Sequence, residues 1–230
     1  MANIEAMWAA RCLKFHALAI KKLMDNEFER MGLGKVRDTF TFINHHKKKV
    51  ILSKASAWDL LNIPIDEGID LFDRLLNECK EYNEDITFDE LFAYVKANSM
   101  EQIGVFDFIE SMRDFLLESS VSPSAGKWFI SGSRHYSWDK GANILGFGRS
   151  NLEKVSVDKF CTINTEELRE KLKFCLKKRI PVVGVTAVFG TTQVSFTKHR
   201  AKYIFNNILH CKSGGRSRQS RGNSEYSARV

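Results

Sequence analysis

The chain has 230 residues, of which 43% are hydrophobic and 11% aromatic, so a buried core is possible and wholesale disorder is excluded. No uncharged apolar run reaches the ~18 residues that a membrane helix needs, which predicts a soluble protein without a membrane partner. The five cysteines are scattered and form no C-x-x-C pair. This usage favours reduced thiols in the cytoplasm over a disulfide framework or a zinc site, and we expect no metal.

The net charge of +7 comes from one end of the chain. After Thr192 there are eight Lys or Arg residues against Glu225 alone, and this difference equals the whole excess. Residues 193–230 also contain a stretch rich in Gly, Ser and Arg, which predicts a basic, disordered tail. Residues 1–192 are neutral, so the globular body shows no preference for nucleic acid.

The first 126 residues indicate helices for most of their length. Residues 1–24 predict one long helix with Asn3 as its N-cap. Two short strands are then expected, at Thr39–Ile43 and Val50–Leu52. Later helices are predicted from side chains that can accept hydrogen bonds from the free amides of a first turn. These side chains are Ser56, Asp66 and Thr87.

From residue 127 the pattern changes to alternating strands and helices. Because the last strand is apolar on both faces, we expect a parallel sheet buried between helices, with right-handed crossovers. Ligands bind such sheets at the carboxyl ends of their strands, where Ser131–His135 and Gly190–Thr192 lie. The predicted order is a strand at Trp128–Ser131, a helix from about His135 to Gly146, a strand at Leu152–Val157, a helix capped by Asn164 or Thr165 and ending at Lys178, and a strand at Pro181–Phe189.

The segment Phe129–Gly148 resembles the group II pyridoxal-phosphate-dependent decarboxylases, especially their bacterial tyrosine decarboxylase branch. The likeness is carried by the run His135-Tyr136-Ser137-Trp138 and by other segments that keep the order of the family. These are Ala2–Arg11, which resembles the stretch after the phosphate loop; Trp58–Ile63, which resembles an insertion of that branch; Val155–Asp158, a strand end; Leu168–Lys178, an amphipathic helix; and Val182–Thr192, an apolar strand ending in Gly-Thr-Thr.

The resemblance implies an α/β fold, namely part of the large domain of the fold-type-I pyridoxal-phosphate (PLP)-dependent transferase fold. Residues 1–24 would be the first helix of this PLP-binding domain, and residues 25–126 a mostly helical insertion. Residues 127–192 would form its β-α-β-α-β core. Residues 193–230 match nothing in the family and would be a disordered, basic addition.

The resemblance also implies a cofactor site. The histidine that matches His135 stacks on the pyridine ring of PLP, and the threonine that matches Thr192 touches the polar edge of the cofactor. Members of the family further require a phosphate loop, an aspartate on the ring nitrogen and a lysine that forms the Schiff base. His135 and Thr192 are therefore the candidate cofactor-binding residues.

The catalytic lysine has no match in this sequence. Gln193–Arg200 follows Thr192 where the family continues towards its ring aspartate, and His46-Lys47 has the right letters in a different element. The family's phosphate loop would precede Ala2. We therefore expect a piece truncated at both ends, with no catalytic residue of its own and with weak or no PLP binding.

The expected function is that of a cytoplasmic fragment of a PLP-dependent amino-acid decarboxylase of the tyrosine or aromatic type, inactive alone. Its substrate class, an amino acid, is implied by the family. One alternative is a non-catalytic subunit that forms a homodimer, or a heterodimer with a full-length relative. Another alternative is binding of nucleic acid or another polyanion through the basic tail. This alternative is less favoured, because the aromatic residues of the tail are scattered and show no arrangement for stacking on bases.

Overall fold

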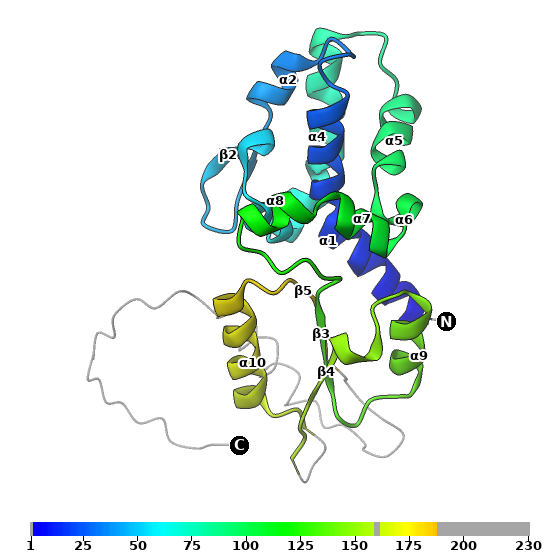
Figure 1. Cartoon of the computed structure of the whole chain (residues 1–230), viewed down its shortest axis with the longest axis vertical. Helices are drawn as coiled ribbons and strands as arrows, with labels where there is room; N and C mark the ends of the chain where they lie inside the picture. The colour runs from blue at the N-terminus through cyan, green and yellow to red at the C-terminus, as the bar shows by residue number, and fades with distance from the viewer. Residues whose placement is uncertain (1, 159–161, 188–230) are drawn as a thin grey trace, which may run out of the picture. The chain divides into compact units, whose positions relative to one another are not determined.

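A computed structural model describes residues 2–158 and 162–187 (Figure 1). They belong to the first of two units into which the chain divides, residues 1–188 and 189–230. The strands are β1 (Thr41–Ile43), β2 (Lys49–Ile51), β3 (Lys127–Ser131), β4 (Leu152–Val155) and β5 (Val182–Thr186). The helices are α1 (Ala2–Asn26), α2 (Gly34–Thr39), α3 (Ala57–Leu61), α4 (Ile65–Tyr82), α5 (Phe88–Ala97), α6 (Met100–Ile103), α7 (Val105–Ser111), α8 (Arg113–Glu118), α9 (Ser137–Ile144) and α10 (Thr165–Lys178), with 3-10 turns η1 (Leu52–Lys54) and η2 (Arg149–Asn151).

Three strands form a parallel sheet in the order β4-β3-β5, so β3 is the central strand. On it, Trp128 lies opposite Leu152 of β4 and opposite Gly184 of β5. The structure thus confirms an α/β arrangement with a small parallel sheet. The handedness of the crossovers stays a prediction. The other pair of strands, β1 and β2, is antiparallel and forms a hairpin where two short strands were expected.

Two strands differ in their observed bounds from the sequence pattern. The strand expected at 152–157 ends at Val155. The next amide, on Ser156, donates to the carboxylate of Glu167 at 2.9 Å and so leaves the ladder. The strand expected at 181–189 is found as β5, and residues 188 and 189 lie outside the described residues.

Helices cover both faces of the parallel sheet. Successive side chains of β3 point to opposite faces, and those on each face pack against a helix. Trp128 and Ile130 pack in one buried cluster with Met7 of α1 and with side chains of α9. Phe129 faces the other way and packs against Leu168 of α10. Figure 1 shows α9 and α10 on opposite sides of the strands.

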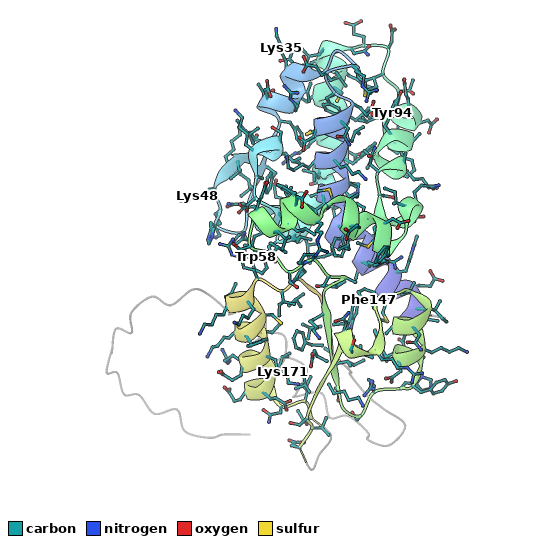
Figure 2. All side chains as sticks on the ribbon, in the orientation of Figure 1. Lys35, Lys48, Trp58, Tyr94, Phe147 and Lys171 are labelled. Carbon is teal, nitrogen blue, oxygen red and sulfur yellow. The ribbon has the colours of Figure 1, made fainter. Side chains whose placement is uncertain are left out.

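Helix α1 connects the sheet to a larger helical core. Met7 belongs to the sheet cluster, whereas Leu18 and most of the second half of α1 are buried among α3, α4 and α5. Arg11 lies between the two clusters. Its Nη1 donates to the carbonyl of Leu145, and its guanidinium lies 6.0 Å from the ring centroid of Phe147, which Figure 2 labels beside α1 and α9. These contacts fix α9 against α1.

Three of the predicted caps are confirmed. The side chain of Ser56 accepts a hydrogen bond from the backbone amide of Asp59, and that of Thr87 accepts one from the amide of Glu90. Asn164 accepts from two amides of the first turn of α10. Each satisfies donors that a helix start otherwise leaves free.

Two predicted caps are wrong. Helix α1 already includes Ala2, so Asn3 lies inside its first turn, and the Asn3 side chain donates to Ser137 of α9 instead. Helix α4 begins at Ile65 after Pro64, so Asp66 lies in the first turn and is not the cap. In both cases the helix starts earlier than the nearest side chain that could cap it.

Cys12, Cys79 and Cys175 are free thiols. Burial raises the pKa of the Cys79 thiol to about 12 and also raises the pKa values of Cys12 and Cys175, so these thiols are protonated at neutral pH. Across the described ranges, no helix combines the length and the apolar character that crossing a bilayer requires.

Candidate functional site

The candidate site is the turn that joins β3 to α9, at the carboxyl edge of the parallel sheet. The amide of Gly132 donates to the carbonyl of Val155 at 2.8 Å, which continues the parallel pairing one residue past the strand. The hydroxyl groups of Ser131 and Ser133 are 2.8 Å apart. Parallel strands end at a shared edge, so this turn lies where such sheets bind ligands.

A bidentate ion pair closes the turn. Nε and Nη2 of Arg134 donate to the two carboxylate oxygens of Asp139 at 3.0 and 2.7 Å. The Arg134 side chain is only 8% exposed, so the pair is partly shielded from water. The hydrogen bonds from Arg134 lower the pKa of Asp139. The pair spans the residues on both sides of His135 and limits how far the turn can move.

His135 itself is exposed, and its ring is held by one nitrogen. The backbone amide of Ser137 donates to Nδ1 at 3.2 Å, and the Ser137 hydroxyl lies 2.8 Å from the same nitrogen. Because the backbone N–H can only donate, Nδ1 is an acceptor, and the neutral ring carries its proton on Nε2. The ring centroid lies 4.3 Å from that of Tyr136, at a tilt of 42°.

The start of α1 lies beside this turn. Nδ2 of Asn3 donates to the hydroxyl of Ser137 at 2.8 Å, so a continuous set of hydrogen bonds runs from α1 to the His135 ring. Gly141 permits the close approach of the two helices, because a Cβ there would lie 3.1 Å from Sδ of Met7. The first turn of α1 brings backbone amides and the positive end of a 25-residue helix next to the turn.

The structure places only one of the two predicted cofactor-binding residues. His135 lies at the expected edge of the sheet, whereas Thr192 lies outside the described residues, so their proximity stays a prediction. The basic segment 193–230 lies outside them too. His46-Lys47 is in the loop between β1 and β2, where the His46 ring packs on His45 with 4.0 Å between centroids.

The sequence pattern missed the residues that support His135. Tyr136 contacts its ring, and Asn3, Arg134 and Asp139 fix the turn around it. The five-residue spacing of Arg134 and Asp139 across a helix start was the available signal. Together these groups present an aromatic imidazole beside helix amides and hydroxyls, a combination that fits a planar ligand with an anionic group.

These observations define an α/β protein with a candidate ligand site at the carboxyl edge of its parallel sheet. The chain is 24% identical over 193 residues to an L-tyrosine decarboxylase of Enterococcus faecium, and this aligned region covers 84% of the chain and 23% of that protein. It is 25% identical over 193 residues to an L-tyrosine decarboxylase of Enterococcus faecalis, with the same coverage of 84% and 23%. For one of Levilactobacillus brevis the identity is 22% over 193 residues, which is 84% of this chain and 22% of that protein.

The chain therefore spans less than a quarter of the length of these curated relatives. No protein-family model matches it. The similarity supports the resemblance to tyrosine decarboxylases at low identity. Membership of the group II PLP-dependent family stays a prediction.

Proposed function

We propose that this chain forms part of the cofactor-binding domain of a PLP-dependent amino-acid decarboxylase that acts on tyrosine or a related aromatic amino acid. The observation that carries the proposal is the position of His135. The residue that the resemblance assigns to the cofactor ring is exposed at the carboxyl edge of a parallel sheet, in a chain similar to L-tyrosine decarboxylases over 84% of its length.

The residues present fit PLP in part. His135 would stack on the pyridine ring, and the first turn of α1 would favour the phosphate, because helix N-termini attract anions. When bound, PLP supplies an electron sink for the carbanion that forms as carbon dioxide leaves an amino acid. The residues described here would orient the cofactor ring, through the position of the His135 side chain. Ser137 holds Nδ1 of His135 and is itself held by Asn3, and Arg134 with Asp139 holds the turn.

We also propose that the 230-residue chain does not decarboxylate amino acids alone. The family's reaction needs a lysine in a His-Lys pair beyond the strand that matches Val182–Thr192. Gln193–Arg200 does not resemble the family there, and His46-Lys47 belongs to the β1–β2 loop. Stacking on His135 and one polar contact with Thr192 would be worth ~1–2 kcal/mol together, besides the attraction of the first turn of α1 for the phosphate.

Carbon dioxide release tests this proposal. Purified chain with PLP and L-tyrosine should release no more carbon dioxide than buffer with PLP alone. The L-tyrosine decarboxylase of E. faecalis serves as the positive control under the same conditions. Release that scales with the concentration of the chain, and that is lost in a His135→Ala variant, would contradict the proposed inactivity while supporting the proposed cofactor site.

A further inference from the structure

A second candidate site is a cavity of about 300 Å³ between the middle of α1 and the start of α4. Its wall is mainly apolar and comes from α1, α3, α4 and β5, with Leu13, Ala17, Leu60, Ile63 and Leu71 among its residues. The volume is at the lower end of the range found for small-molecule sites. Such a cavity suits a short hydrocarbon chain better than a nucleotide or a sugar.

Lys14 gives this cavity a positive charge. Its Nζ donates to Oδ1 of Asn62 at 3.3 Å, and no carboxylate lies within ion-pair distance of it in the part of the chain that the structure describes. Burial lowers the pKa of the Lys14 ammonium to about 8. The amine is still mostly protonated at neutral pH, so the cavity holds a cation without a counter-ion.

The other polar groups of the wall do not offset this charge. His16 lines the cavity, and burial lowers its pKa, so its ring is neutral at neutral pH. Pro64 and Ile65 at the start of α4 line the cavity, whereas Asp66 and Glu67 of the same first turn do not. Glu67 in the same turn is held elsewhere, by Arg74 at 2.9 Å and by the amide of Ile43 at 3.0 Å.

We propose that this cavity binds a small carboxylic acid with an apolar chain. The carboxylate pairs with the Lys14 ammonium, and the chain packs among Leu13, Ile63 and Leu71. Taking a carboxylate gives the unpaired, partly buried cation a counter-ion and adds apolar contact. A zwitterionic amino acid is disfavoured, because its ammonium group would lie beside that of Lys14.

This site is independent of the proposed decarboxylase function. Lys14 follows Asn3 by eleven residues along α1, which is about 16 Å at the α-helical rise. None of the residues around His135 lines the cavity in the described part of the chain. Failure of either proposal therefore leaves the other standing.

The test titrates hexanoate, hexan-1-ol and hexylamine into the full 230-residue chain, with binding followed by the NMR signals of the methyl groups that line the cavity. Hexanoate should bind at least ~10-fold more tightly than hexylamine, equivalent to about 1.4 kcal/mol. Hexan-1-ol should lie between them. Equal binding of all three probes, or tighter binding of hexylamine, would overturn the proposal.

Two variants separate charge from shape. Lys14→Met keeps an unbranched side chain that is one atom shorter and removes the charged amine. It should weaken the binding of hexanoate by at least ~10-fold and leave the binding of hexan-1-ol within about twofold. Gly68→Leu keeps Lys14 and places a side chain into the cavity, so it should abolish binding of both probes. Unchanged hexanoate affinity in Lys14→Met would overturn the role of the charge. Unchanged affinity in Gly68→Leu, with its circular dichroism spectrum retained, would overturn the location.

Discussion

Nδ2 of Asn3 donates a hydrogen bond of 2.8 Å to the hydroxyl of Ser137, which ties the first turn of α1 to the helix that follows His135. The two residues are 134 positions apart in the sequence. The same hydroxyl lies 2.8 Å from Nδ1 of His135. The position of the imidazole thus depends on a contact between the first turn of α1 and the first residue of α9.

A double-mutant cycle measures this contact. Asn3→Ala and Ser137→Ala should each destabilise the fold by ~0.5–1.5 kcal/mol, because each removes one partner of a partly buried hydrogen bond. The double variant should lose less than the sum of the two, with a coupling of at least ~0.5 kcal/mol. Urea unfolding of the four proteins provides the values. Strict additivity would show that the contact contributes nothing in solution.

Two glycines form a matched pair for core packing. A Cβ at Gly184 would lie 2.8 Å from Cη2 of Trp128, a side chain that is only 5% exposed and whose Nε1 donates to Thr186 at 2.7 Å. A Cβ at Gly68 would meet nothing closer than 3.8 Å. Gly184→Ala should therefore destabilise the fold by ~1–3 kcal/mol through overpacking.

The control variant Gly68→Ala should stabilise the fold by up to ~1 kcal/mol, because alanine replaces a helical glycine there without a clash. Thermal unfolding followed by circular dichroism ranks the two variants. The reverse ranking would mean that Trp128 does not pack over Gly184.

Lys14 predicts a pH-dependent stability. Its pKa is lowered from 10.5 to about 8 in the folded chain, so the unfolded chain binds more protons between those values, and stability rises with pH across that window. Below pH 8 both states are charged, and the cost of burial is fully present. His16 and His45 have lowered pKa values and are neutral throughout the window.

Lys14→Met should thus be more stable than the natural chain at pH 7, by ~1–2 kcal/mol for a partly exposed side chain, and this advantage should shrink from pH 8 to pH 10.5. Urea unfolding of both proteins at several pH values gives the difference, in which the other groups cancel. An advantage that does not change with pH would rule out a buried ammonium at this position.

The Arg134–Asp139 pair predicts a second pH dependence, in the acid range, in which stability also rises with pH. Hydrogen bonds from Arg134 lower the pKa of Asp139, so the pair stabilises the fold above the unfolded pKa of 3.8, and this contribution is lost as the pH falls through the lower folded value. Asp139→Asn should cost ~1–3 kcal/mol at pH 7, because Arg134 is left without its partner. Urea unfolding at pH 7 and pH 3 measures the cost. A cost that is equal at both pH values would contradict the ion pair.

Much of the fold could be predicted because its signals are local. The caps at Ser56, Thr87 and Asn164 depend on residues two or three positions away, and the apolar run at Val182–Thr186 indicates a strand by its own composition. In the described part of the chain this strand lies at the edge of the sheet, and its residues are partly exposed. The supports of the candidate site are not local. Asn3 was read as a helix cap, because nothing in the sequence shows that Ser137 lies next to it.

The cavity was missed for the same reason. Lys14 belongs to the polar edge of an amphipathic helix by its spacing, which normally indicates a solvated side chain. It is partly buried because α3 and the start of α4 line the same cavity, as the contact with Asn62 shows. A helical pattern reports which face is apolar, and it does not report which distant segment will cover the remaining edge.

The cofactor site can be tested most directly with pyridoxamine 5'-phosphate, which has the ring and phosphate of PLP but no aldehyde to react with surface lysines. Titrated into the labelled chain, it should shift the NMR signals of His135, Tyr136 and the first turn of α1, with a dissociation constant above about 1 mM. His135→Ala should remove this response, and the matched control His46→Ala should keep it. Shifts that avoid His135 and the start of α1, or that survive in His135→Ala, would contradict the assignment of this sheet edge as a cofactor site.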